Sequence, residues 1–173
     1  MSLHDHNHAH DHDHAQQASA RWCFVCGVEN KHGLQIRFFN DGPLRAVARV
    51  TLGEPYQSYP GVAHGGIIAT ILDETMGRAI LSDGAGPKAD ITDERFMFTA
   101  KMEVRYRQPV PLHQEFAVRG WVEKDRGQMV QVAGDVQLAD GSVAVEGSAT
   151  LMQIPSDQVA EMSAADVGWR VYP

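Results

Sequence analysis

The sequence predicts an α+β fold in which an antiparallel sheet of about six strands curls around one long central helix. Residues Gly65–Leu81 are the only long segment whose apolar side chains recur at helical spacing. Strand-like runs with turn signals lie on both sides of this segment. Because a single helix cannot cover both faces of a six-stranded sheet, a curled sheet wrapped around the helix is the economical arrangement.

The strands are predicted from alternating apolar and polar residues between turn signals. The first hairpin turn is expected at Asn40-Asp41-Gly42, and later turns at Asp125-Arg126-Gly127 and Asp140-Gly141. Ser156 could cap a short terminal helix that runs through Met162. The six predicted strands cover residues 34–38, 46–50, 99–108, 115–123, 129–138 and 142–154.

The composition is typical of a single globular domain and argues against several functions. The 173 residues fit one domain, and 15 basic against 22 acidic side chains give a net charge of −7, which argues against nucleic-acid binding. No apolar run is long enough for a membrane span, and no charged-then-apolar leader resembles a signal peptide. Two cysteines are too few for a disulfide scaffold, so a cytoplasmic location is expected.

Residues 1–20 are expected to form a disordered, histidine-rich tail ahead of one domain that covers residues 21–173. Histidine occupies every second position from His4 to His14, and such a segment has nothing to bury. Since alternate side chains of an extended chain face the same way, the imidazoles could present a metal-binding edge. A solvated tail with incidental metal affinity fits the pattern as well.

A Cys-x-x-Cys-Gly turn, with Cys23 and Cys26, opens the domain and is followed by Asn30 and by Gly33-Leu34. Such a pair can be half of a zinc site, but the sequence has no other cysteine to supply the second half. The alternative is a compact turn with two packed thiols. No metal ligand set and no cofactor are expected on this basis.

The predicted helix carries one carboxylate among small neighbours. Asp73 lies at the edge of the apolar face, and Ala69 and Gly77 stand one turn away on either side. Partial shielding from water should raise the pKa and the basicity of this carboxylate; an ordinary exposed carboxylate is the alternative. Glu74 points elsewhere and is expected to form a surface ion pair with Arg78.

The start of the helix is the second candidate for a binding or catalytic site. Gly65 and Gly66 follow His64, where the first N–H groups of a helix have no internal acceptors. Without side chains these residues would let a ligand carbonyl approach closely, and the helix dipole favours developing negative charge there. The pattern fits an oxyanion hole, and it also fits a tight turn into the helix with a capping histidine.

Together, His64-Gly65-Gly66 and Asp73, nine positions after the histidine, resemble the central helix of the hot-dog-fold acyl-CoA thioesterases. The resemblance is in particular to the phenylacetate-pathway and 4-hydroxybenzoyl-CoA thioesterase-like group. It covers roughly residues 34–154 and includes Thr99 and a strand that ends in Tyr-x-x-Pro at Tyr106. The Cys-x-x-Cys-Gly opening resembles one found in a subset of members. The resemblance implies a hot-dog fold and hydrolysis of an acyl-CoA thioester to free acid and coenzyme A.

The same resemblance implies roles for individual residues. Asp73 would be the catalytic base or nucleophile, and Gly65 would donate its backbone N–H to the thioester oxygen. His64 would help to hold or polarise the carbonyl, and Thr99 would orient water. Ser58 stands where some relatives have an asparagine bound to the nucleophilic water, so the water-positioning scheme of this chain is open.

Substrate-binding residues follow from the coenzyme A that the resemblance implies. Its phosphates need basic partners, although a solvated, mixed-charge sheet face would explain the same cations. Phe96 and Phe98 are candidates for the lining of an acyl tunnel, with core packing as the alternative, and Gly66 would let the substrate approach the helix start. The basic candidates are Lys101, Arg105, Arg107 and Lys124.

The resemblance also implies a site that lies across a dimer interface, with the carboxylate from one chain and the glycine N–H from the other. A homo-oligomer, either a dimer or a tetramer, is therefore expected, with neither nucleic acid nor membrane as a partner. Two other functions fit the residues: a hot-dog enoyl-CoA hydratase or dehydratase, and a non-catalytic acyl-CoA-binding or metal-binding protein. The acyl group itself is not predicted, because loops and a second subunit would build its pocket.

Overall fold

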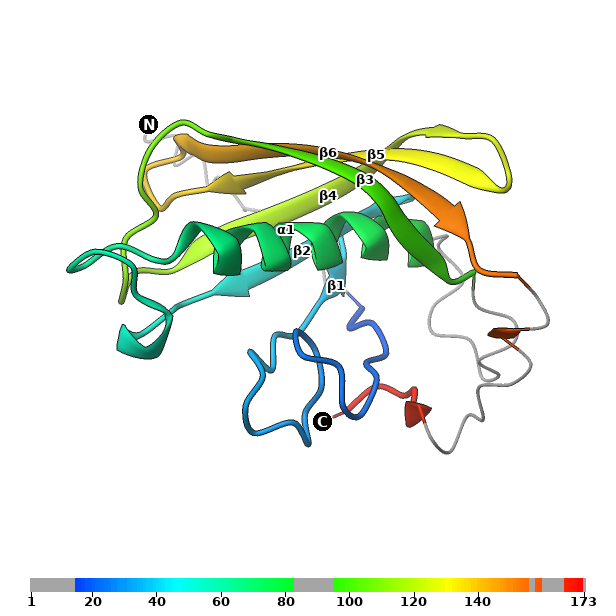
Figure 1. The fold of residues 1–173 in the computed structure, drawn as a ribbon, viewed down its shortest axis with the longest axis horizontal. Coiled ribbons are helices and arrows are strands. Elements are labelled where there is room, and N and C mark those ends of the chain that lie inside the picture. The colour runs from blue at the N-terminus through cyan, green and yellow to red at the C-terminus, as the bar shows by residue number, and fades with distance from the viewer. Residues whose placement is uncertain (1–14, 83–94, 156–157, 160–166, 173) are drawn as a thin grey trace, which may run out of the picture.

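The computed structural model describes residues 15–82, 95–155, 158–159 and 167–172. Within them, one six-stranded antiparallel sheet packs against one long helix, as the sequence predicted (Figure 1). The chain runs through two strands, then the helix, then four strands. Most of the terminal helix predicted after Ser156 lies outside the described residues. Residues 158–159 are the part of it that is described, and they are helical.

The helix forms where the apolar spacing predicted it. α1 spans Gly65–Arg78 and continues as a 3-10 turn, η2, over Ala79–Leu81; a second 3-10 turn, η1, covers Glu54–Tyr56. Burying a large apolar side chain contributes about 1.5–3 kcal/mol, so packing holds the helix in place more than its intrinsic propensity does. No helix in the described ranges is long and apolar enough to cross a membrane. The apolar side chains of α1 that are at most 2% exposed are Ile68, Ile71, Leu72 and Met76.

The sheet has the strand order β1-β2-β4-β5-β6-β3, and all neighbouring strands are antiparallel. In the described part of the chain, β3 pairs only with β6, so the other edge of β3 is open. The strands are β1 Phe39–Asn40, β2 Arg45–Val50, β3 Met97–Tyr106, β4 Phe116–Asp125, β5 Met129–Gln137 and β6 Val143–Gln153.

One predicted strand does not form. The alternation in residues 34–38 predicted a strand, but β1 begins only at Phe39. The N–H groups of Leu34 and Ile36 donate to carbonyls of the Cys-x-x-Cys turn instead, and Gln35 has a positive φ of 53°. The alternation therefore reflects which side chains enter the core, and not the pairing of this segment with another strand.

α1 approaches the sheet closely because a row of small residues crosses the strands beneath it. Gly120 of β4 pairs with Gly134 of β5, which pairs with Gly147 of β6, and Ala46 of β2 extends the row. A Cβ atom at Gly120 would lie 2.5 Å from the backbone carbonyl oxygen of Thr75. At Gly134 and Gly147 it would lie 2.9 and 2.7 Å from side-chain carbons of α1. The backbone of the helix can occupy its position only because Gly120 has no side chain, and the two other glycines leave room for the side chains of Leu72 and Met76.

The two ends of the described chain cover the side of α1 that faces away from the sheet (Figure 1). Ser19 and Arg170 exchange backbone hydrogen bonds of 2.8 and 3.2 Å, and Gln17, Ala18 and Ser19 are at most 5% exposed. Residues 15–20 thus belong to the folded domain, although their composition assigned them to the disordered tail. Composition could not reveal this, because the partner strand segment lies at the opposite end of the sequence. The remainder of the predicted tail lies outside the described residues.

Gly120→Ala should destabilise the protein, because the added methyl group would collide with the backbone of α1. Overpacking of this kind costs about 1–3 kcal/mol. Gly77→Ala is the matched control: a Cβ there meets nothing within 4 Å, and alanine favours a helix over glycine by about 1 kcal/mol. Urea unfolding should therefore show a loss of stability for the first variant and a gain for the second. Equal stabilities would contradict the role assigned to the glycine row.

Candidate active site

A histidine caps the first turn of α1. His64 is the N-cap residue, and its Nδ1 accepts the N–H of Gly66 at 3.0 Å. A Cβ at Gly66 would lie 3.1 Å from Nδ1, so glycine lets the imidazole come this close. Because Nδ1 is an acceptor, the proton of the neutral imidazole is on Nε2, which remains available as a donor. The N–H of Gly66, which the sequence also assigned to substrate, is used by His64.

The backbone N–H of Gly65 is the free donor at this helix start. In the described part of the chain, no acceptor lies within hydrogen-bond distance of it. The carbonyl of Gly65 accepts a 2.8 Å hydrogen bond from the hydroxyl of Tyr106, at the end of β3. An unpaired N–H at a helix N-terminus is suited to bind a carbonyl oxygen that gains negative charge.

Asp73 lies two turns further along α1, beside the start of β3. The hydroxyl of Thr99 donates to Asp73 Oδ1 at 2.8 Å. Among the described residues, no group donates to Oδ2, so this second oxygen is left for a ligand or a water molecule. The carboxylate is held by one oxygen and can react through the other.

Partial burial makes Asp73 more basic than an ordinary aspartate. Desolvation raises the pKa of its carboxyl group, the hydrogen bond from Thr99 lowers it, and the negative charge of Glu74 raises it further. The net direction is upward, which confirms the prediction made from the small neighbours of Asp73.

A cavity of about 370 Å³ opens beside Asp73. Its lining combines the Asp73–Thr99 pair with Gly77 and the aromatic residues Phe96 and Phe98. Both phenylalanines that the sequence assigned to an acyl tunnel are therefore close to the carboxylate. Glu74, Arg78 and Arg95 line the cavity as well, so aromatic and charged groups share its wall.

A second cavity, of about 390 Å³, opens beside Gly65 at the other end of the helix. Ser58, Tyr106 and Arg107 line it together with Gly65. Ser58 therefore accompanies the helix start and not Asp73. Arg107 lies just beyond the end of β3 and forms a 2.6 Å ion pair with Glu146.

The two cavities cannot act on one reacting group within a single chain. Asp73 follows Gly65 by eight positions, which at about 1.5 Å per residue is about 12 Å along the helix axis. A thioester carbonyl cannot contact both the carboxylate and the free N–H over this distance. One chain thus holds the Asp73 carboxylate and the free Gly65 N–H in two separate cavities along α1.

The other basic candidates lie away from both cavities. Lys101 and Arg105 alternate with core-facing residues of β3, so they project from the sheet face opposite α1. Lys101 forms a 2.9 Å ion pair with Glu103. Arg105 lines a hollow on this outer face, where nearby carboxylates would repel the phosphates of coenzyme A. The carboxylates of that hollow are Glu103, Glu123, Asp135 and Glu146.

Trp169 and Arg95 are among the residues of the Asp73 cavity that sequence reasoning missed. Trp169 reaches it from the C-terminal segment, where its ring packs edge to face on Phe96 with centroids 5.3 Å apart. Arg95 also lines the cavity, and its guanidinium pairs with Asp125 at 2.5 Å. Neither residue belongs to a motif, and no periodic pattern predicts that the chain returns to α1 at Trp169.

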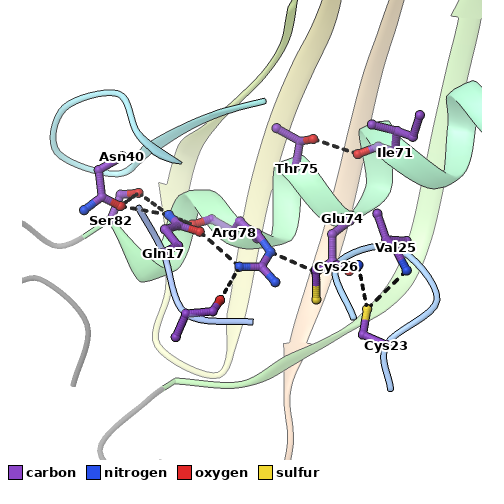
Figure 2. A network of polar contacts seen from close by, with 11 residues as sticks. Gln17, Cys23, Val25, Cys26, Asn40, Ile71, Glu74, Thr75, Arg78 and Ser82 are labelled. Carbon is purple, nitrogen blue, oxygen red and sulfur yellow. Dashed lines mark hydrogen bonds and ion pairs between the residues drawn. The ribbon is translucent and has the colours of Figure 1, made fainter. Parts of the chain in front are cut away.

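The Glu74–Arg78 ion pair forms at 2.9 Å as predicted, but Arg78 is buried and Glu74 partly buried, so the pair is not a fully exposed surface pair (Figure 2). Arg78 is 3% exposed. Its Nη1 donates to the carbonyl of Ala18 at 2.7 Å, and its guanidinium lies over the rings of Phe38 and Trp169. Arg78 is buried because the two terminal segments cover it, and the sequence did not predict that these segments pack there.

Possible metal ligands gather at one place in the described residues. Cys23, Cys26 and Glu74 bring ligand atoms within 4.8 Å of one another. Asp73 is not part of this group, so the candidate catalytic carboxylate is separate from it.

A curled antiparallel sheet around one long helix defines a hot-dog domain. The chain belongs to the thioesterase superfamily, whose family model matches residues 60–145. A crystal structure of another thioesterase superfamily protein has a TM-score of 0.66 at 30% identity and covers 76% of this chain and 60% of that one. A Streptococcus mutans protein bound to acetyl CoA shares the fold, with a TM-score of 0.56 at 17% identity over 65% of this chain and 83% of that one.

Curated relatives confirm the resemblance to acyl-CoA thioesterases. The Rattus norvegicus acyl-coenzyme A thioesterase THEM4 is 29% identical over 72% of this chain and 50% of its own length. The Mus musculus protein of the same name is 31% identical over 60% of this chain and 40% of its own length. The chain thus spans half or less of the length of these relatives.

Asp73→Asn should stabilise the folded chain near neutral pH. Because the pKa of Asp73 is higher in the folded than in the unfolded chain, charging this carboxylate weakens folding as the pH rises through that pKa. Below about pH 4 the aspartate is protonated in the unfolded chain as well, and the difference between variant and wild type should disappear. Urea unfolding at acidic and neutral pH measures this. An unchanged or lowered stability of the variant at neutral pH would contradict the prediction.

Proposed function

We propose that this protein is a homodimeric acyl-CoA thioesterase that hydrolyses a thioester to a free acid and coenzyme A. The observation that carries the proposal is the Asp73–Thr99 pair. It consists of a partly buried carboxylate with one oxygen fixed at 2.8 Å and the other without a protein donor in the described residues, at the edge of an aromatic cavity. Membership of the thioesterase superfamily and the acyl-CoA thioesterase relatives support it.

The proposed reaction uses Asp73 as a general base. Its Oδ2 removes a proton from water while the water oxygen bonds to the thioester carbonyl carbon. The carbonyl oxygen becomes an oxyanion, which the Gly65 N–H stabilises, with His64 Nε2–H as a second donor. Collapse of this intermediate breaks the C–S bond, the sulfur leaves with the electron pair, and Asp73 returns the proton to it. The balance needs no cofactor.

Attack by Asp73 itself is the alternative first step. The carboxylate would then form a mixed anhydride with the acyl group and expel the coenzyme A thiolate before water enters. Trapping with hydroxylamine distinguishes the two routes, because only the anhydride route passes through an acylated enzyme.

A second protomer supplies the oxyanion donor in this proposal. The open edge of β3 carries two aromatic side chains, Phe98 and Tyr106, that are 56% and 52% exposed. Such an edge is a template for pairing with another strand. If two β3 edges pair antiparallel about a twofold axis, the Thr99 end of one strand lies against the Tyr106 end of the other. Because Asp73 accompanies Thr99 and Gly65 accompanies Tyr106, the Asp73 cavity of one chain then meets the Gly65 cavity of the other.

The substrate occupies both cavities in this dimer. The acyl group lies in the aromatic cavity beside Asp73, with Phe96 and Phe98 as lining. Arg107 at the Gly65 cavity and Arg95 at the Asp73 cavity are the cations proposed to bind the phosphates of coenzyme A, which would replace their present partners Glu146 and Asp125.

Asp73→Asn should lower kcat for acyl-CoA hydrolysis by about 100- to 10,000-fold, which is the usual contribution of a general base. Glu115→Gln is the control, since it removes an exposed carboxylate that pairs only loosely with Arg49 at 3.5 Å. Thiol release from acyl-CoAs of different chain lengths, aromatic ones included, measures the rates. Full activity of the aspartate variant would rule out the proposed mechanism. Hydration of an enoyl-CoA, or acyl-CoA binding without turnover by the wild type, would favour the alternative functions.

Gly65→Pro should remove the oxyanion donor without disturbing the helix start. Proline is well tolerated at the first position of a helix, and His64 has the extended conformation, with φ −67° and ψ 128°, that a residue before proline needs. Loss of one such donor lowers kcat by about 100- to 1,000-fold.

Mixing the two inactive variants tests the shared site. A heterodimer of Asp73→Asn and Gly65→Pro chains contains one site with both native groups, so random exchange should restore about a quarter of the wild-type rate. Mixtures with no more activity than the separate variants, under conditions where mass spectrometry shows subunit exchange, would contradict a site built from two chains.

A further inference from the structure

The Cys-x-x-Cys-Gly turn is folded around the first of its two sulfurs. Cys23 Sγ accepts the backbone N–H groups of Val25 and Cys26, both at 3.4 Å (Figure 2). The N–H of Gly27 returns to the Cys23 carbonyl at 2.9 Å, and a Cβ at Gly27 would lie 2.4 Å from that oxygen, so only glycine lets the turn close. N–H groups that point at a sulfur stabilise the thiolate, which is the form that binds metal ions.

The residues after the turn hold its backbone in place. The N–H of Leu34 donates to the carbonyl of Phe24, between the two cysteines, at 2.8 Å. A Cβ at Gly33 would lie 2.4 Å from the same oxygen, and the Asn30 side chain donates to the Trp22 carbonyl at 3.3 Å. The Asn30 and Gly33-Leu34 pattern therefore has a structural role, which is to fix the backbone that carries both sulfurs.

Glu74 brings a third donor to the two sulfurs from α1. Its carboxylate oxygen and both sulfurs lie within 4.8 Å of one another, close enough for one ion to contact all three. Cys26 is 1% exposed, and Cys23 and Glu74 are partly buried. Two thiolates and a carboxylate suit a thiolate-preferring divalent cation such as Zn²⁺.

The charges of this cluster balance when a divalent cation is added. Two thiolates and the Glu74 carboxylate carry three negative charges, and the buried guanidinium of Arg78, 2.9 Å from Glu74 Oε1, supplies one positive charge. A divalent ion supplies the other two. Since uncompensated buried charge is costly, the neutral group is the favourable one. The hydrogen bond from Arg78 also orients the carboxylate, as the hydrogen-bond partners of metal ligands commonly do.

We propose that Cys23, Cys26 and Glu74 form a binding site for a divalent, thiolate-preferring cation, with Zn²⁺ as the candidate and water in the fourth position of a tetrahedral site. The ion links the N-terminal turn to α1 at the residue that follows Asp73. This site departs from the expectation of no metal, which rested on the missing second cysteine pair. The third ligand is a carboxylate from a distant helix, which the spacing of cysteines cannot reveal.

The first test separates this site from the tail, which can bind metal by itself. It uses the full chain with the six histidines from His4 to His14 changed to alanine, prepared reduced and free of metal. Titration with Co²⁺ should load about one ion per chain and produce a thiolate-to-cobalt charge-transfer band in the near ultraviolet, which Zn²⁺ then removes. Nitrogen and oxygen ligands give no such band, so its absence at saturating cobalt would overturn the proposal.

The second test identifies the ligands in the same background. Cys26→Ser should abolish the charge-transfer band, and Glu74→Gln should weaken zinc binding by at least about tenfold. Glu115→Gln, which changes an exposed, ion-paired carboxylate elsewhere, should bind zinc like the parent. Equal zinc affinities of Glu74→Gln and Glu115→Gln would overturn the assignment of these ligands. A charge-transfer band that survives in Cys26→Ser would do the same.

A third test needs no substitution at the site and so applies even where a variant fails to fold. One equivalent of Zn²⁺ should slow the alkylation of Cys23 and Cys26 by iodoacetamide by at least about tenfold and raise the melting temperature. An alkylation rate that zinc leaves unchanged would overturn the proposal. A Cys23–Cys26 disulfide that forms equally fast with and without zinc would do the same.

Discussion

The close contact between α1 and the sheet is the constraint on which both cavities depend. At Gly120 the helix backbone lies where a side chain would stand, with the Thr75 carbonyl 2.5 Å from the position of a Cβ. Asp73 precedes Thr75 by two residues, so its reach to Thr99 depends on this depth of packing. At the other end of the helix, Tyr106 binds the carbonyl of the first helical residue at 2.8 Å. Two hydroxyl groups of one edge strand therefore bind α1, one at its first residue and one at Asp73 in its second half, and each stands beside one of the candidate site groups.

The opposite side of α1 is anchored by a buried cation. Arg78 binds Glu74 within the helix and the carbonyl of Ala18 outside it, and its guanidinium lies 4.5 Å from the ring centre of Phe38 and 5.5 Å from that of Trp169 (Figure 2). Removing one partner of a buried ion pair costs about 3–5 kcal/mol, whereas an apolar replacement of the whole pair is often neutral. The network is thus better explained by the positions it imposes on the terminal segments than by a gain in stability.

The sequence could predict what depends on short spacing along the chain. Helical periodicity located α1, and the small neighbours of Asp73 on consecutive turns predicted its raised pKa. Contacts between distant segments could not be predicted in this way: Trp169 and Ala18 reach the helix from the two ends of the chain, and they bury the arginine of an expected surface ion pair. The strand prediction for residues 34–38 was wrong for a related reason. Alternation indicates which side chains are buried, but it does not identify the hydrogen-bond partner of the backbone.

The sequence also could not predict which backbone N–H groups are free at the start of the helix. Two adjacent glycines suggested two donors for a substrate, but the choice between a ligand and a local cap depends on the χ angles of His64, which composition does not encode. The structure assigns the N–H of Gly66 to the imidazole and leaves that of Gly65 open in the described residues. The second glycine is therefore required by the cap, and only the first has an N–H available for chemistry.

Neighbouring residues divide α1 between its two environments. Successive helical side chains point about 100° apart, so Asp73 meets β3 while Glu74 meets the N-terminal segment. A rotation of the helix that withdrew Asp73 from Thr99 would also pull Arg78 away from the Ala18 carbonyl and Glu74 away from the two cysteine sulfurs. The N-terminal segment thus fixes the rotation of the helix, as the glycine row fixes its depth. A partly buried carboxylate loses hydration free energy in its charged form. Asp73 therefore keeps one orientation only because the surrounding structure determines both the rotation and the depth of α1.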